Sequence, residues 1–198
     1  MSPWQTFLVL LASFILGSVP FGYLLAKWRF QTDIREHGSK NIGATNVART
    51  FGIWVGLAVL FFDALKGVAA ISIAFHFLPH HEIWVCLAGL AAVLGHVFSP
   101  FMKFKGGKGI ATSLGVLIAL FWPAGAIAIV GFALIVFIFR IVSLASFSAM
   151  VAALVGFWLF GQTTSLWFFG LPAVILALWA HRSNWRRLLK GQEPRFGR

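Results

Sequence analysis

Residues 104–112 read Phe-Lys-Gly-Gly-Lys-Gly-Ile-Ala-Thr and lie between two strongly apolar segments. Glycines let backbone N–H groups approach an anion closely, and the first turn of a helix that follows them offers unpaired N–H donors. Lys108 adds a positive charge. The stretch therefore predicts a phosphate-binding turn that opens a helix at the edge of a membrane. The alternative is a basic loop that only keeps a connection between spans in the cytoplasm.

The composition places the chain in a membrane. Hydrophobic residues make up 60% of the 198 residues, charged residues 11%, and 22 residues are phenylalanine, which no ordinary soluble domain shows. A single cysteine, Cys86, excludes an intrachain disulfide and a metal site built from thiolates. Residues 4–26 lack a basic leader and a cleavage signature, so we expect a retained membrane helix there.

Apolar stretches divide the chain into seven candidate spans. They cover roughly residues 4–26, 52–78, 84–102, 109–121, 124–139, 142–160 and 165–181. The division at Trp122-Pro123 is the open point, because residues 109–139 can also form one long helix. The segment 109–121 extends only about 20 Å, against a hydrocarbon core of about 30 Å, so some helices are expected to be short.

The positive-inside rule decides between six and seven spans. With seven spans and the N-terminus outside, no Lys or Arg is left on the outer side, and only Lys66 falls within a span. The cytoplasmic cations are then Lys27, Arg29, Arg35, Lys40, Arg49, Lys103, Lys105, Lys108, Arg140, Arg182, Arg186, Arg187, Lys190, Arg195 and Arg198. The sequence therefore predicts an all-α integral membrane protein, one polytopic domain over residues 1–198, with seven transmembrane helices and a cytoplasmic C-terminus.

The net charge of +11 follows mostly from this topology and from attraction to anionic lipids. Because the cations lie along membrane-proximal loops, we expect no nucleic-acid partner.

Further polar clusters lie on the same cytoplasmic side. The loop 38–49 offers hydroxyl and amide side chains and ends in an arginine suited to phosphate; its candidates are Ser39, Asn41, Thr45, Asn46 and Arg49. The alternative is a solvated loop with helix caps.

Two clusters open and close the last spans. Ser143 fits a helix N-cap, which leaves Ser146 spare. His181 and Asn184, at positions i and i+3, share one helix face and form a candidate base-and-orienter or oxyanion pair. An interfacial anchor is the alternative role for His181, and His96 is more typical of a packing residue.

These clusters together resemble, in order and spacing, the bacterial acyl-phosphate-dependent glycerol-3-phosphate acyltransferases, the PlsY family. The resemblance covers the whole chain. It is carried by residues 17–20, 26–27 and 38–49, by Asp63-x-x-Lys66-Gly67, by residues 95–96 and 104–109, by Ser143-Leu144-x-Ser146, and by His181-Arg182-x-Asn184-x-x-Arg187-Leu188-x-x-Gly191-x-Glu193.

The resemblance implies transfer of an acyl group from an acyl phosphate to the 1-hydroxyl of sn-glycerol 3-phosphate, as the first acylation of phospholipid biosynthesis. It implies His181, Asn184, Lys108 and Ser146 as catalytic residues. Phosphate binding is assigned to Ser39, Asn41, Thr45, Asn46, Arg49, Gly106, Gly107, Lys108 and Gly109. It implies no metal, no organic cofactor, the bacterial inner membrane, a cytoplasmic active site, and a peripheral acyl-phosphate synthase as a partner that supplies the donor.

The residues agree with this reaction. A cationic pocket flanked by Phe98, Phe101 and Phe104 can take the donor's head group while its acyl tail lies in an apolar groove. Phosphate is a good leaving group, so positioning and oxyanion stabilisation are enough. Whether His181 or a phosphate takes the hydroxyl proton stays open.

Asp63 and Lys66 share one face of a span, where charges need partners, and we expect an internal ion pair that supports the site together with His96 and Glu193. The intramembrane charges and short helices also suit the alternative function, a small polytopic transporter of an anionic solute, but the outer ends offer almost no anion-binding residues. A non-enzymatic scaffold would not need these clusters. His76, His80 and His81 read as an interfacial turn rather than a metal site.

Overall fold

Helices make up the fold of the computed structural model, which is described over residues 2–196; Arg198 of the predicted cytoplasmic tail lies outside that range. No β-strand occurs among these residues. In this described range, six helical segments are long and apolar enough to cross a membrane, namely Pro3–Phe30, Ile53–Phe77, Glu82–Met102, Ile110–Phe139, Val142–Leu159 and Thr163–Ala180. The expectation of an all-α chain with several membrane helices is therefore confirmed.

The first of these segments is broken in the middle. Helix α1 (Pro3–Ser18) ends before Pro20, and α2 (Phe21–Phe30) follows it. A residue before proline is pushed out of the helical region, and Val19 has φ −59° and ψ 118°. Main-chain carbonyl groups at this break are accordingly free for other donors: Ser18 O accepts from Ser99 Oγ at 2.6 Å, and Val19 O accepts from Lys66 Nζ at 2.9 Å.

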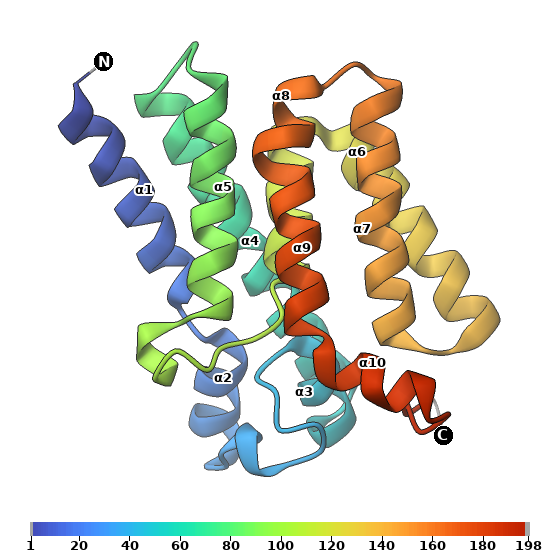
Figure 1. Ribbon diagram of the computed structural model, residues 1–198. Coiled ribbons are helices and arrows are strands. Elements are labelled where there is room, and N and C mark those ends of the chain that lie inside the picture. Colours follow the sequence, from blue (N-terminus) through green and yellow to red (C-terminus); the bar gives the residue numbers. More distant parts are fainter. Residues whose placement is uncertain (1, 197–198) are drawn as a thin grey trace.

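A short helical layer joins the first segment to the second. The turn Ile34–Glu36 and helix α3 (Ala44–Phe51) lie at the same end of the molecule as α2 (Figure 1). Helix α4 (Ile53–Phe77) starts directly after α3 because Gly52, at φ 96°, takes a conformation that L side chains rarely adopt. The loop 38–49 is thereby held against the start of α4.

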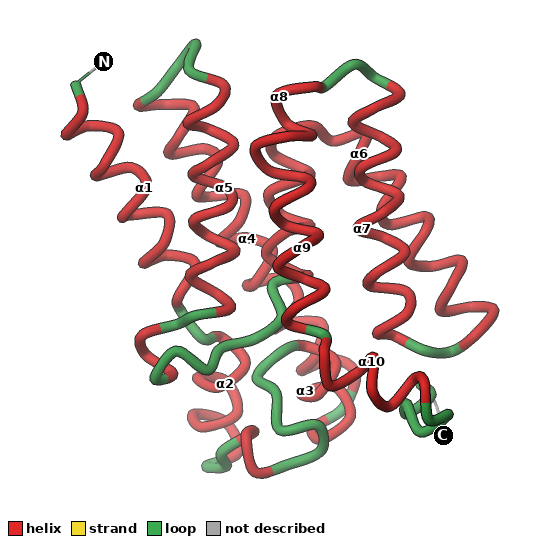
Figure 2. Tube along the Cα trace, in the orientation of Figure 1, coloured by secondary structure: helices red, strands yellow, loops and turns green. Residues whose placement is uncertain are grey.

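Helix α5 (Glu82–Val97) returns to that end of the molecule and is followed by the turn Pro100–Met102 and the stretch 103–109. The rest of the chain forms α6 (Ile110–Phe139), α7 (Val142–Leu159), the short α8 (Thr163–Ser165), a π-helical turn (Leu166–Gly170), α9 (Leu171–Ala180) and α10 (Arg182–Leu189). Figure 2 shows the loops gathered at the two ends of the long helices.

Helix α6 folds back on itself. Phe121, two residues before Pro123, has non-helical φ −158° and ψ 90°. A Cβ built on Gly125 would lie 3.3 Å from Ile118 N, whereas residues seven apart in a straight helix are about 10 Å apart. Both halves of α6 consequently border one cavity, which Ile110 of the first half and Phe132 of the second half line. In Figure 1 the chain rises to the bend in the first half of α6 and descends from it in the second half.

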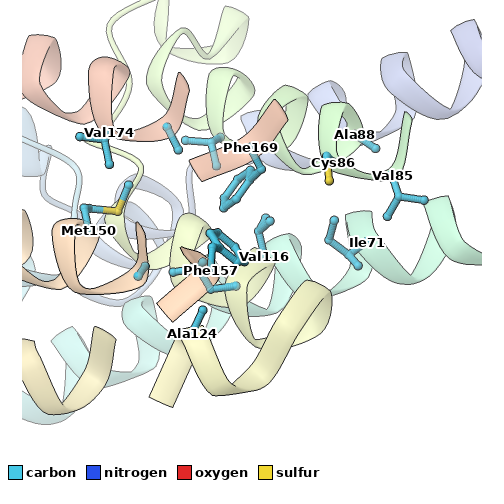
Figure 3. Packing of buried hydrophobic residues seen from close by; sticks show 14 of the residues in the cluster. Ile71, Val85, Cys86, Ala88, Val116, Ala124, Met150, Phe157, Phe169 and Val174 are labelled. Atoms are coloured by element: carbon cyan, nitrogen blue, oxygen red, sulfur yellow. The ribbon is translucent and has the colours of Figure 1, made fainter. Parts of the chain in front are cut away.

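Close contacts through glycines fix α6 against α4. A Cβ at Gly115 would lie 1.8 Å from Ala64 O, and one at Gly67 would lie 2.3 Å from Thr112 O, so only glycine allows this approach. Around the contact, Val116, Phe157 and Phe169 belong to a buried apolar cluster (Figure 3). This packing fixes the direction of the first half of α6, and with it the place of the turn that precedes it.

Candidate active site

The polar stretches singled out in the sequence meet around one cavity of about 130 Å³, which we call the reaction cavity. It lies at the end of the molecule that holds α3 and α10 (Figure 1). The predicted site residues that line it are Ser39, Asn41, Thr45, Asn46, Arg49, Lys108, Gly109, Ser146, His181 and Asn184, and the predicted supporting residues are Asp63, His96 and Glu193. Gly106 and Gly107 line a second cavity beside it, and Lys66 lines neither.

Glu193 is the centre of a hydrogen-bond network in this cavity. Its Oε1 accepts from Asn184 Nδ2 at 2.6 Å and from Ser143 Oγ at 2.8 Å, and its Oε2 accepts from Arg187 Nε at 2.7 Å. Burial alone would raise the pKa of Glu193, but these three hydrogen bonds outweigh it and hold the pKa below its usual value. An ionised Glu193 thus fixes α10 to the start of α7.

Lys108 joins this network from the turn before α6. Its ammonium group donates a hydrogen bond to Asn184 Oδ1, so the amide of Asn184 bridges a cation and the Glu193 carboxylate. Burial lowers the pKa of Lys108 to about 8, while Glu193 opposes this shift and Arg187 and Arg49 add to it. Lys108, Arg49 and Arg187 thus share one nearby carboxylate, Glu193, and a bound phosphate would neutralise the remaining positive charge.

His181 lies where α9 meets α10 and is 6% exposed. Its Nδ1 is 2.8 Å from Ala177 O, and a carbonyl can only accept, so the ring hydrogen is on Nδ1 and Nε2 is a free acceptor. Burial, reinforced by the charge of Lys108, lowers the pKa of His181 to about 4. His181 is therefore neutral near pH 7.

The loop before α3 is held by Asn46. Its Oδ1 accepts from Ser39 N at 2.8 Å, and its Nδ2 lies 2.8 Å from Asn41 O and 3.0 Å from His37 O. The sequence predicted Asn46 as a phosphate ligand. Its amide is occupied by the main chain and shapes the loop that presents Ser39, while the phosphate contact of Asn46 stays a prediction.

The glycines before Lys108 pack the turn against the end of α5, and their part in phosphate binding stays a prediction. Gly106 N donates to Val97 O and Gly107 N donates to His96 O, each at 3.0 Å, so both N–H groups are paired with the main chain. A Cβ at Gly106 would lie 2.0 Å from His96 O, and one at Gly107 would lie 2.0 Å from His96 Nε2. The two glycines let the turn lie flat on the end of α5.

Behind His96 lies the predicted internal ion pair. Lys66 Nζ is 2.8 Å from Asp63 Oδ1 and 2.7 Å from His96 Nδ1, and both side chains of the ion pair are almost fully buried. An ammonium group can only donate, so His96 Nδ1 accepts and the ring hydrogen is on Nε2, directed at Gly107. The ion pair therefore fixes the ring on which the Lys108 turn rests.

Two functional neighbours were missed or misread in the sequence. Ser143 was predicted as the N-cap of its helix, but Ile141 holds that position and the Ser143 hydroxyl binds Glu193. Arg187 lines the reaction cavity although it was only quoted as part of a motif. Its spacing was the available signal, because His181, Asn184 and Arg187 follow at i, i+3 and i+6 on one helix face. Ser146, predicted as catalytic, lines the cavity while its hydroxyl donates to Val142 O at 2.9 Å.

The aromatic flank predicted for the head group does not border the reaction cavity. Phe101 and Phe104 are exposed, Phe98 lies against Trp179 with ring centroids 5.2 Å apart and planes tilted by 42°, and only Phe104 reaches the second cavity. Among residues 2–196, no group of three His, Cys, Asp or Glu side chains is arranged to hold a metal ion, and His80 and His81 are exposed.

Residues 7–191 match the protein family described as glycerol-3-phosphate acyltransferase. The chain belongs to this family. The glycerol-3-phosphate acyltransferase of Prochlorococcus marinus is 45% identical over 196 residues, which cover 96% of this chain and 93% of that protein. That of Mesorhizobium japonicum is 43% identical over 190 residues, which cover 96% of this chain and 95% of that protein. The resemblance seen in the sequence is thus confirmed.

Solved structures of the family agree in fold. A crystal structure of PlsY, an integral membrane glycerol 3-phosphate acyltransferase, in its glycerol 3-phosphate form, superposes with a TM-score of 0.92 at 37% identity, over 97% of this chain and 96% of that one. Its lysophosphatidic acid form gives a TM-score of 0.89 at 36% identity, over 97% of this chain and 95% of that one. With the six long apolar helices, these relatives identify a multi-pass membrane acyltransferase.

The contact between His96 and Gly107 can be tested by enlarging residue 107 and, in the same chain, shortening residue 96. Gly107→Ala alone should lower kcat by about 100-fold, because the new methyl group displaces the Lys108 turn by about 1 Å. His96→Asn removes the ring edge but keeps an acceptor for Lys66, so the double variant should recover much of the activity that Gly107→Ala loses. The measurement is kcat of the single and double variants in lipid nanodiscs.

Gly131→Ala is the control. The atom nearest to a Cβ built on Gly131 is Ala152 Cβ, at 3.2 Å, so the added methyl group meets no backbone atom at that distance. It should retain activity with and without His96→Asn. Losses that simply multiply in the double variant would show that His96 does not support the turn through this contact.

Proposed function

We propose that this chain transfers a fatty acyl group from an acyl phosphate to the 1-hydroxyl of sn-glycerol 3-phosphate. The products are 1-acylglycerol 3-phosphate, or lysophosphatidic acid, and inorganic phosphate. The observation that carries the proposal is one cavity lined by Arg49, Lys108 and Arg187 together with His181, whose Nε2 accepts no hydrogen bond from residues 2–196. Both substrates carry phosphate, so two anions and one hydroxyl group find partners in the same place.

The acyl chain of the donor has a matching apolar cavity. A cavity of about 320 Å³ between α4, α6 and α7 is lined by ten residues, all of them apolar. It adjoins the reaction cavity, since Leu60, Ile110, Ala111 and Phe132 line both. A donor with its phosphate beside Lys108 can therefore extend its chain away from the cations without burying an unpaired charge.

The chemistry needs no covalent nucleophile on the protein. The glycerol hydroxyl oxygen attacks the carbonyl carbon of the donor, the bond from that carbon to the phosphate oxygen breaks, and the phosphate leaves with its electron pair. Lys108, Arg49 and Arg187 balance the charge of the leaving phosphate, and donors around the cavity stabilise the oxyanion. Fixing the two substrates side by side supplies much of the rate enhancement.

The hydroxyl proton is assigned to a phosphate rather than to His181. A phosphate monoester has a second pKa of about 6. The pKa of His181 is about 4, so the phosphate is the stronger base. His181 Nε2 accepts the hydrogen bond of the hydroxyl group and orients it, and the proton passes to a phosphate oxygen. Asn184 and Ser146 complete the walls of this position.

The decisive experiment supplies the purified chain in lipid with palmitoyl phosphate and sn-glycerol 3-phosphate. Phosphate and lysophosphatidic acid should form one to one without added metal, coenzyme A or nucleotide. Palmitoyl-coenzyme A should be a poor donor, because its thioester places no phosphate at the reacting carbon. Use of the thioester alone would reject the proposed donor, and passage of phosphate across sealed vesicles without acylated product would favour the transporter.

The pH profile separates the roles of Lys108 and His181. Lys108 must be charged to hold phosphate, and its pKa is about 8 in the free protein, so kcat/KM for glycerol 3-phosphate should fall as the pH rises above about 8. Lys108→Ala should lower kcat/KM at neutral pH by about 100-fold to 1000-fold. Lys108→Arg should abolish the alkaline limb, because a guanidinium stays charged, but remain poorly active because its planar fork does not fit the turn.

The acidic side of the same profile tests His181. The phosphate of the substrate should give an inflection near pH 6, and this inflection should persist in His181→Gln, since the pKa of His181 is about 4. An inflection near pH 6.5 that vanishes in His181→Gln would instead make His181 the general base.

We further propose seven membrane crossings in the bacterial inner membrane, with the N-terminus outside and the active site at the cytoplasmic face. The fold-back of α6 at Phe121 supports counting its two halves as separate crossings. The loops that carry the cations then share one side with α10. A peripheral acyl-phosphate synthase stays part of the proposal as the source of the donor.

Cysteine labelling measures this topology. After Cys86→Ser, single cysteines at positions 35 and 190 should react with an impermeant reagent only from the cytoplasmic side, and one at position 80 only from the outer side. Labelling of positions 35 and 190 from opposite sides would refute seven crossings.

A further inference from the structure

A second cavity adjoins the reaction cavity and has a different character. Its volume is about 320 Å³, and we call it the vestibule. It is bordered by the loop 39–41, the stretch 104–108 and the α9–α10 junction. Ser39, Asn41, Lys108 and Arg187 line both cavities, so the two are neighbours across the Lys108 side chain.

The vestibule is lined by cations without any carboxylate. Its cationic residues are Lys40, Lys105, Lys108, Arg182, Arg186 and Arg187. The reaction cavity, by contrast, contains the carboxylates of Asp63 and Glu193. A concave surface that gathers charges of one sign raises the local concentration of ions of the other sign.

Several of these cations are free to bind a ligand. Within residues 2–196, the side chains of Lys40, Lys105 and Arg186 form no ion pair and no hydrogen bond, and Lys40 and Lys105 are exposed. Arg187 is bound to Glu193, and Arg182 lies over Trp179 with its guanidinium carbon 4.2 Å from the ring centroid. Three unpaired cations in one hollow repel one another, and a bound dianion relieves that repulsion.

Membrane topology alone does not explain this grouping. The positive-inside rule needs cations near the ends of spans but does not gather them in a cavity. Arg29, Lys103 and Lys190 satisfy the rule equally well, yet they line neither cavity. The clustering of cations beside Lys108 therefore indicates an anion-binding site.

We propose that the vestibule is a second anion site, which captures a free phosphate monoester or inorganic phosphate from water and exchanges it with the reaction cavity past Lys108. It takes up glycerol 3-phosphate on the way in and holds inorganic phosphate on the way out. The apolar cavity lined by Leu60 and Phe132 serves the lipid donor separately. Glycerol 3-phosphate thus reaches the reaction cavity from the vestibule, and the acyl phosphate reaches it from the apolar cavity.

The inference rests on the proposed function, so the experiment includes a binding arm that needs no turnover. The triple variant Lys40→Gln/Lys105→Gln/Arg186→Gln removes the three unpaired vestibule charges and leaves Arg182, which lies over Trp179, in place. The matched control, Arg29→Gln/Lys103→Gln/Lys190→Gln, makes the same change in net charge. Both are compared with the parent chain in phosphatidylcholine nanodiscs, over a range of sodium chloride concentrations.

The vestibule variant should lower kcat/KM for glycerol 3-phosphate by roughly tenfold or more and weaken its dependence on salt. Its kcat and its KM for palmitoyl phosphate should change less than about twofold, since the reacting groups and the donor cavity are untouched. The control should resemble the parent chain. Equal effects of the two triple variants on kcat/KM and on its salt dependence would overturn the proposal.

The binding arm titrates inorganic phosphate and glycerol 3-phosphate by calorimetry. Weaker binding of both ligands to the vestibule variant alone supports the proposal, and this result can be read even if the chain shows no turnover with acyl phosphate. If the vestibule variant binds only glycerol 3-phosphate more weakly, the proposal is supported, and the ligand of the vestibule is the substrate rather than inorganic phosphate. If adding phosphatidylglycerol to the nanodiscs abolishes the difference between the variants, the cations hold lipid head groups and the proposal fails.

Discussion

The ammonium group of Lys66 requires acceptors in a place where water does not supply them. Its side chain is 1% exposed, and it is held by the Asp63 carboxylate, by Val19 O at the break in the first span, and by the ring of His96. An unpaired charge at such a position costs several kcal/mol, so α1, α4 and α5 must meet here. Because His96 then supports Gly107, the place of Lys108 depends on this one cation.

The opposite wall of the reaction cavity depends on one anion. Glu193 ties α10 to α7 through Arg187, Asn184 and Ser143, and Asn184 passes the connection on to Lys108. The cavity is therefore framed by two ionic centres, one among the long helices and one on the chain after α10. Their charges balance internally, which leaves the remaining cations to meet the negative charge of the substrates.

Sequence reasoning found which segments form the site but not how each residue acts. Charged, hydroxyl and amide residues with fixed spacing showed that loop 38–49, Lys108 and His181–Asn184 belong together. The pattern does not show that the amide of Asn46 is consumed by the main chain, that Gly106 and Gly107 make room for His96, or that Ser143 binds Glu193. These depend on contacts between segments far apart in the chain, which local periodicity does not encode.

At the break before α2, the backbone conformation matters more than the identity of the side chain at position 19. The acceptor that Lys66 finds at position 19 is a main-chain carbonyl, so any side chain at that position supplies it. What has to be kept is the irregular backbone that directs the carbonyl toward α4, and Pro20 enforces it. A substitution that restored a continuous helix through residue 20 would remove no polar side chain, yet it would withdraw a ligand from a buried charge more than forty positions away.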